Sequence, residues 1–216
     1  MPTKSVRVLL TAVVAALLVS GCGSGSTAVR TASSGGSSAA GSVSTAPSAT
    51  PSAAPSSTAP QALAASVPVR LQIPGIGVDT SVMRLGLASD GSVQVPPIEA
   101  NAPAGWYQGS PMPGQVGPSV ILAHVTVGKY GDGVFLHLSR LRQGDRVVAR
   151  LQDGKAAVFT VYRVQTVAKA DFPTAAVYGN VSRPELRLIT CGGPRNSAGN
   201  GYLDNVVVYA ALTAEQ

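Results

Sequence analysis

The chain reads Glu185-Leu186-Arg187-Leu188-Ile189-Thr190-Cys191-Gly192-Gly193-Pro194 across one segment. Apolar residues alternate along its first half, a pattern that predicts a β-strand. We expect the strand to end at Cys191, because the Gly-Gly-Pro sequence that follows favours a turn into a loop. A thiol at such a position has a fixed backbone while its sulfur can face a cleft, which is how a nucleophile is presented.

The rest of residues 67–216 has the same β character. Runs rich in Val, Leu, Ile, Thr and Tyr lie at 67–73, 93–95, 119–124, 146–151, 157–167, 186–191 and 205–211. Asp153-Gly154 separates two alternating runs and predicts a tight hairpin. Helical stretches are few: residues 134–141 would place Phe135, Leu138 and Leu141 on one face, and another short helix could begin at 171–174. Many short strands between Gly and Pro turns favour a single all-β domain closed into a barrel.

The first 22 residues are organised like a secretory signal. Lys4 and Arg7 precede an uncharged, mostly apolar run over 8–19, which is shorter than the roughly 20 residues of a comfortable membrane span. Val19-Ser20-Gly21-Cys22 resembles the lipobox of bacterial lipoproteins, whose cysteine is lipidated and becomes the mature N-terminus. The alternative is an uncleaved signal anchor in which Cys22 is incidental. Either reading predicts an exported chain that is tethered to the extracytoplasmic face of the membrane.

Residues 23–66 are of low complexity, since 39 of these 44 positions are Gly, Ala, Ser, Thr or Pro. Such a composition predicts a disordered linker, because it cannot bury enough apolar surface to offset the entropy of ordering. The remaining residues, 67–216, are enough for one domain with its own core. They hold 13 of the 16 basic and all 10 acidic residues, a net charge of +3. The basic residues are scattered singly, which argues against nucleic acid as a partner.

Cys191 needs a base or a cationic partner, because only the thiolate is nucleophilic. Of the two histidines, His124 ends the apolar run at 119–123, so it also lies at the end of a predicted strand. If these two strands are neighbours, His124 and Cys191 lie side by side at one rim of the barrel. His137 lies inside the short amphipathic stretch and is expected to be a surface or half-buried helix residue.

Several stretches carry a resemblance to the sortases. Leu188-Ile189-Thr190-Cys191 is similar to their cysteine motif, and His124 resembles their histidine. The series that resembles the actinobacterial class F group in order runs through 69–79, Val95-Pro96-Pro97, Ala104-Gly105-Trp106-Tyr107, 144–147 and 203–210. Arg187 stands where Thr or Ser is often found in that family, and we expect this strand position to be of little consequence.

The resemblance implies an eight-stranded β-barrel cysteine transpeptidase that works without a cofactor. Sortases cleave a sorting signal of the Leu-Pro-x-Thr-Gly type on exported proteins, hold the acyl group as a thioester, and pass it to an amine, often of a peptidoglycan precursor. In those roles Cys191 is the nucleophile and His124 protonates the leaving amine. An arginine near the cysteine stabilises the developing oxyanion.

The arginine is where this chain departs from the family pattern. The family's arginine often lies nine or more residues after the cysteine, but Asn200 stands nine residues on, and Asp204 and Asn205 follow. Arg195 is the only arginine after Cys191, so it is the candidate for this role. Its alternative is a solvated loop charge.

Two other functions remain open at this point. The chain could be a surface lipoprotein that kept the barrel and binds peptide or cell-wall fragments without catalysis, or a slow protease that only hydrolyses the signals. The sequence has no Cys-x-x-Cys, His-Glu-x-x-His or calcium-loop pattern, so no metal site is expected. Asp132 is expected to be a turn residue.

Overall fold

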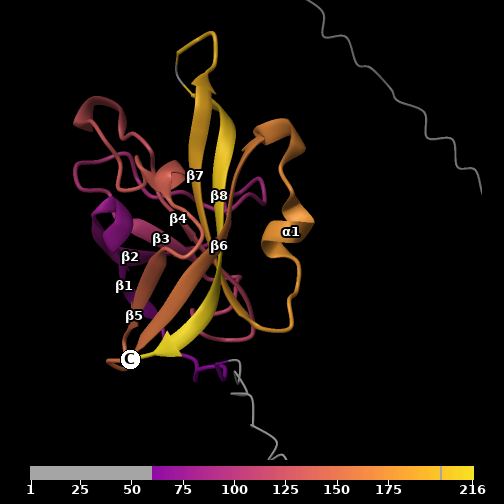
Figure 1. The fold of residues 1–216 in the computed structure, drawn as a ribbon. Coiled ribbons are helices and arrows are strands. Elements are labelled where there is room, and N and C mark those ends of the chain that lie inside the picture. Colours follow the sequence, from indigo (N-terminus) through magenta and orange to yellow (C-terminus); the bar gives the residue numbers. More distant parts are fainter. Residues whose placement is uncertain (1–59, 200) are drawn as a thin grey trace, which may run out of the picture. The chain divides into compact units, whose positions relative to one another are not determined.

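Eight β-strands form a closed barrel in the computed structural model, which describes residues 60–199 and 201–216 (Figure 1). Around the barrel they follow the order β1-β2-β3-β4-β7-β8-β6-β5. The predicted eight-stranded β-barrel is therefore confirmed. The strands are β1 (Pro68–Ile73), β2 (Val78–Leu85), β3 (Ala104–Tyr107), β4 (Gly117–Leu122), β5 (Arg146–Leu151), β6 (Ala156–Ala168), β7 (Pro184–Arg195) and β8 (Tyr202–Glu215).

Helical segments among the described residues are short. One α-helix, α1, covers Thr174–Tyr178, close to where the sequence predicts it. The 3-10 turns are η1 (Pro74–Ile76), η2 (Gly128–Tyr130), η3 (Leu138–Arg140) and η4 (Lys169–Asp171). Phe135, Leu138 and Leu141 are buried together in the core, as their spacing predicts. No helix in the described part of the chain is long and apolar enough to cross a membrane.

The strand order brings distant parts of the sequence together. β4 pairs with β7 in parallel, with Leu122 opposite Ile189. β7 in turn pairs antiparallel with β8, and Cys191 lies opposite Asn205. One region of the barrel wall therefore contains the C-terminal end of β4, Cys191 and the beginning of β8.

Period-two alternation decides which side chains face the barrel interior. On β7, Leu186 and Leu188 belong to the main core, whereas Ile189 packs in a second cluster on the outer face. Cys191 is two residues beyond Ile189, so it also faces outward. Asn205 shares that face, because paired residues in a sheet project to the same side.

The segment between β6 and β7 covers the outer face and carries α1, which Figure 1 shows beside the central strands. Val177 of α1 is fully buried against Val120 of β4 and Ile189 of β7. Phe172 and Tyr178 pack on the margin of the same cluster. This cover forms one wall above the strands that carry Cys191.

Arg187 of β7 holds the segment between β6 and β7 against the barrel. Its side chain is 2% exposed, its guanidinium lies 2.6 Å from a carboxylate oxygen of Glu185, and its Nε donates to the backbone oxygen of Ala176 in α1. It also stacks 4.7 Å from the ring centroid of Tyr209. The expectation that this position is of little consequence is wrong, because a buried guanidinium requires these partners.

Several strand boundaries differ from the predictions. β7 continues past Cys191 to Arg195, with an irregular register after Gly192, so the Gly-Gly-Pro sequence does not end the strand. Gly193 takes a left-handed φ of 69°, which allows the chain to bulge and then resume pairing with β8. Residues 93–95 form only a single bridge, between Val93 and Leu87, because Pro96 and Pro97 follow and cannot donate to a ladder.

The strands β2 and β3 were not predicted, each for a different reason. β2 carries polar residues on an exposed face, and β3 has only four residues, one of them a glycine. Both belong to the closed barrel through their parallel pairing. The β5–β6 hairpin around Asp153-Gly154 forms as predicted.

The packing of the domain begins before residue 67. Leu63 is buried in the main core and its backbone N–H donates to the carbonyl of Gly114. The hydroxyl of Ser66 accepts from the backbone N–H of Asp153. Leu63 and Ser66 both lie within the range 23–66 that the composition assigns to the linker. Cys22 and the signal segment lie outside the described residues.

Candidate active site

Cys191 and His124 converge on one place through strand register. The backbone N–H of Ala123 donates to the carbonyl of Ile189 at 3.2 Å, which continues the β4–β7 pairing past the end of β4. His124 and Cys191 are each the residue two positions beyond Leu122 and Ile189, which are paired. They are therefore level with one another on neighbouring strands, although 67 positions separate them in sequence.

Two buried interactions fix the chain around His124. The hydroxyl of Thr190 donates to the carbonyl of Ala123 at 2.7 Å, tying the residues before Cys191 and His124 to each other. The backbone N–H of Phe135 donates to the carbonyl of His124 at 3.0 Å. A side chain at Gly133 would place its Cβ 2.2 Å from that same carbonyl oxygen, so this close approach requires glycine.

Cys191 and His124 line a common groove on the outer face of the barrel, with a volume of about 350 Å³. Residues before β3 form one wall, the β6–β7 segment forms the other, and β4, β7 and β8 form the floor. We call it the Cys191 groove. Its lining residues are Val93, Val95, Pro96, Leu122, Ala123, His124, Phe172, Tyr178, Ile189, Thr190, Cys191 and Asn205.

Most of this lining is apolar, and its polar groups gather around Cys191. The thiol is free and half-buried. His124, level with Cys191 on the neighbouring strand, and Asn205, opposite it on β8, line the same groove. A carbonyl held against the sulfur would thus have a histidine and an amide side chain in the same groove.

The imidazole of His124 is held by the segment before β3. Its Nε2 lies 2.6 Å from the carbonyl oxygen of the buried residue Pro96. Because a carbonyl can only accept, Nε2 carries a hydrogen, and in the neutral ring Nδ1 is the nitrogen without one.

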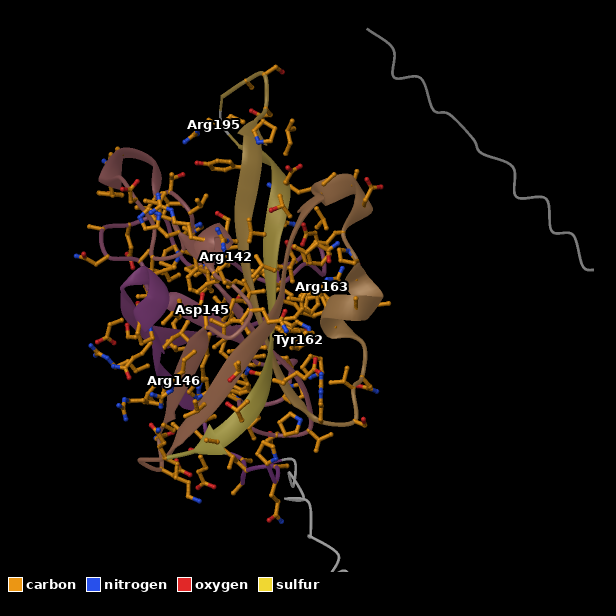
Figure 2. The ribbon with its side chains drawn as sticks, viewed as in Figure 1. Arg142, Asp145, Arg146, Tyr162, Arg163 and Arg195 are labelled. Carbon is orange, nitrogen blue, oxygen red and sulfur yellow. The ribbon has the colours of Figure 1, made fainter. Side chains whose placement is uncertain are left out.

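Arg195 lies apart from the groove. It ends β7 and pairs with Tyr202 of β8, and Figure 2 shows it at the outer end of the β7–β8 hairpin. Its guanidinium donates to the carbonyl of Gly199 at 3.2 Å and to the hydroxyl of Tyr202 at 3.1 Å, and it stacks over the Tyr202 ring. It is not among the residues that line the Cys191 groove.

The other candidates take structural positions. His137 precedes η3 and lines a separate cavity with Asp132 and Val134. Asp132 pairs with Thr126 in an isolated β-bridge in the loop after β4, and not in the turn that the sequence predicts. Trp106 is buried in the main core and donates to the carbonyl of Pro111. No group of three His, Cys, Asp or Glu side chains suited to a metal occurs within residues 60–199 and 201–216.

Sequence reasoning missed two polar contributors to this site. Asn205 was noted only as opening the last strand, and its position opposite Cys191 depends on the β7–β8 register. Pro96 belongs to a recognised motif, but its contact with His124 joins residues 28 positions apart. The β7–β8 register shifts between Gly192 and Arg195, so counting back from the hairpin loop does not find Asn205. Nothing local in the sequence indicates the Pro96 contact.

The structure therefore combines a closed eight-stranded barrel with a cysteine and a histidine that are level on neighbouring parallel strands and line one groove. Comparison with known proteins identifies the family that has this fold. Residues 71–213 match the sortase domain model. That match covers well over half of the chain, and the chain belongs to the sortase family. Comparison with curated protein sequences gives no match.

Solved structures agree on the fold. Sortase C of Streptococcus pneumoniae has 20% identity and a TM-score of 0.50, over 67% of this chain and 65% of that one. The lid mutant of Corynebacterium diphtheriae sortase A has 18% identity and a TM-score of 0.51, over 68% and 70%. Sortase C-1 of Actinomyces oris has 19% identity and a TM-score of 0.51, over 67% and 73%. The chain thus matches just under two thirds of the length of the pneumococcal protein.

Proposed function

We propose that this chain is a sortase-type cysteine transpeptidase that cleaves a Leu-Pro-x-Thr-Gly-type sorting signal on exported proteins. The observation that carries the proposal is the convergence of Cys191 and His124 on one apolar groove from neighbouring strands. The groove is open to solvent and mostly apolar in its lining, which suits a peptide segment. The acceptor would be an amine, such as that of a peptidoglycan precursor.

In the first step the Cys191 thiolate attacks the threonine carbonyl carbon, and a C–S bond forms. His124, as the imidazolium, gives a proton to the amide nitrogen while the C–N bond breaks, leaving a thioester. In the second step the acceptor amine attacks the thioester, His124 takes its proton, and sulfur leaves as the thiolate. The bond from Nε2 to the Pro96 carbonyl can persist throughout if the proton moves through Nδ1.

Two side chains are candidates to stabilise the oxyanion. Arg195 is the only arginine after Cys191, but it would have to release Gly199 and Tyr202 to reach the sulfur. Asn205 already lines the groove opposite Cys191 and can donate through its amide. An arrangement without a cationic donor at the thiol would slow catalysis, because such donors act on charge that develops in the transition state.

The finer assignments extend this proposal. The ordered series of motifs supports membership of the class F group, and family membership suggests the cell envelope as the location. We propose a signal peptide over 1–22, a linker over 23–66 and a catalytic domain over 67–216. Leu63 and Ser66, at the end of the linker range, pack on the domain. Tethering would run through a lipid on Cys22 or through an N-terminal anchor.

The test is the intact mass of the full-length chain, purified in mild detergent and incubated with a pool of Leu-Pro-x-Thr-Gly-type peptides. We expect an acyl adduct on Cys191 that triglycine or hydroxylamine discharges. His124→Ala should abolish the adduct, whereas His137→Ala, which alters the other histidine, should leave it intact. Adduct formation that survives Cys191→Ala would contradict the proposal.

A non-catalytic or slowly hydrolytic envelope protein that binds peptide or cell-wall fragments is the second candidate. The engagement of Arg195 within its own hairpin favours it, because no arginine then lines the Cys191 groove. In that case peptides would bind equally well to the wild type and to Cys191→Ala, with no thioester. Release of acid rather than of the amine product would identify hydrolysis.

A further inference from the structure

A second cavity continues the Cys191 groove along β4. It has a volume of about 410 Å³ and shares Val93 and Tyr178 with the Cys191 groove. We call it the upstream cavity. Its lining residues are Leu87, Gly91, Val93, Tyr107, Gly109, Ser110, Pro111, Pro118, Thr174, Tyr178 and Asn180.

The two cavities share one floor and the same two walls. On β4 the outward-facing positions are Pro118, Val120, Leu122 and then His124, by the same alternation that exposes Cys191. Pro118 lines the upstream cavity and Leu122 lines the Cys191 groove, while the buried Val120 lies between them. The α1 side and the segment before β3 flank both cavities, and Val93 and Tyr178 line both, so the cavities lie end to end. Between their floors, Val177 of α1 packs on Val120. We call the pair of cavities the channel.

The length of this channel exceeds that of the sorting motif. His124 is level with Cys191, and six residue steps along β4 separate it from Pro118, about 20 Å at about 3.3 Å per step. The three motif residues before the attacked threonine would occupy about 10 Å of that path. The upstream cavity therefore lies where about the first three residues preceding the motif leucine would be.

The direction of the substrate follows from the two-step chemistry. The acyl segment stays bound through both steps and gains from a lined channel, whereas the leaving segment must give way to the acceptor amine. The channel should therefore hold the acyl side. Its upstream lining contains prolines, aliphatic residues and the rings of Tyr107 and Tyr178, together with the uncharged polar residues Ser110, Thr174 and Asn180, and no charged side chain. Burying a charge there would be costly, and burying an apolar side chain would be favourable.

We propose that the upstream cavity binds the residues immediately N-terminal to the sorting motif, and that it selects an uncharged, apolar segment there. This inference rests on the proposed function. It adds a specificity site to that function, so that the substrate is recognised over about eight residues instead of the pentapeptide alone.

The experiment compares kcat/KM of the full-length chain for four peptides that share one motif. One carries the motif alone, one adds Val-Pro-Val upstream, one adds Asp-Ser-Asp upstream, and one adds Val-Pro-Val downstream. We expect the apolar upstream extension to raise kcat/KM by about tenfold, the change that a single buried apolar side chain can produce. The acidic extension and the downstream extension should give no gain.

Two variants connect that gain to the cavity. Leu87→Asp places a carboxylate in the upstream cavity at a side chain that is 53% exposed, and it should reduce the ratio of extended to motif-only kcat/KM to about one. Val116→Asp makes the same change at a matched exposure of 52% outside the cavity, and it should keep the ratio.

Each outcome decides the question. Equal kcat/KM for all peptides, or a gain that persists in Leu87→Asp, would overturn the upstream cavity while leaving the proposed function intact. Acylation by none of the four peptides would overturn both. A gain from the downstream extension alone would assign the channel to the leaving segment and would refute the inference.

Discussion

At the scale of single residues, the proposed reaction needs a group that stabilises the oxyanion beside Cys191. Asn205 lines the groove there, and Arg195 bonds to Gly199 and Tyr202 instead. We expect Asn205→Ala to lower the rate of Cys191 acylation by about 10²-fold, the effect of losing one oxyanion donor. Arg195→Ala should lower it by less than about tenfold, because its own bonds hold it in the hairpin.

Single-turnover acylation followed by mass spectrometry distinguishes the two. The reverse order of effects would assign the role to Arg195 and require the hairpin to rearrange when substrate binds. Lys155→Ala, which changes a charged group paired with Glu215 elsewhere on the barrel, serves as the control and should keep the wild-type rate.

Thr190 acts on the site through the backbone. Its side chain is buried, and its hydroxyl donates to the carbonyl of Ala123, the residue before His124. Thr190→Val keeps the shape but leaves that carbonyl without its hydroxyl donor, so unfolding free energy should fall by about 1–3 kcal/mol. Urea unfolding measures this. Thr166→Val, at an exposed position on β6, should change it by less than about 0.5 kcal/mol.

At the scale of elements, the connection from β6 to β7 depends on a buried ion network. Glu185 accepts from Arg183 at 2.6 Å, from Arg187 at 2.6 Å and from the hydroxyl of Tyr162 at 2.8 Å. Burial alone would raise the pKa of Glu185, but the hydrogen bonds from Arg183, Tyr162 and Arg187 outweigh it and hold that pKa below its ordinary value. Arg187 carries the effect to α1 and so to the wall of the Cys191 groove.

The sign of the pH dependence follows from this lowered pKa. A carboxyl with a lowered folded pKa contributes stability above its ordinary pKa of 4.5, and loses it as the pH falls through the folded value. The wild type should therefore lose stability below about pH 4.5. Glu185→Gln should be less stable at pH 7 and lose less on acidification. Urea midpoints at pH 7, 5, 4 and 3 check this, and parallel curves for the two proteins would refute it.

The elements that could be predicted are those whose signal is local. The Asp153-Gly154 hairpin and the alternation around Ile189 follow from turn chemistry and side-chain period, and both form. The bulge at Gly193 was read as a strand end, since a glycine pair indicates a break whether or not pairing resumes beyond it. β2 pairs with β3 in parallel, and parallel strands are not joined by a tight turn, so no turn sequence predicts this pairing.

At the scale of the whole molecule, closure of the barrel is what assembles the site. From the sequence, Cys191 and His124 are predicted at strand ends, but not on neighbouring strands. In the chain β5 and β6 come between β4 and β7, whereas in the barrel β4 and β7 are adjacent. Asn205, Pro96 and the α1 wall join them only through that closure. A chain without an alignment gives residue types and local periods, but such long-range contacts depend on the register of strands far apart in sequence.

The last prediction concerns how the whole chain is held at the envelope. If Val19-Ser20-Gly21-Cys22 is a lipobox, the mature chain begins at Cys22 with a lipid on its sulfur, and Cys22→Ser should block processing so that the longer precursor accumulates. If the apolar run over 8–19 is an uncleaved anchor, both proteins should keep Met1 to Gly21 and have the same length. Intact mass of the membrane fraction separates these outcomes. Cys191→Ser alters the other cysteine and should leave processing unchanged, so a shift in that variant would show that maturation depends on the chain's own activity and not on the lipobox alone.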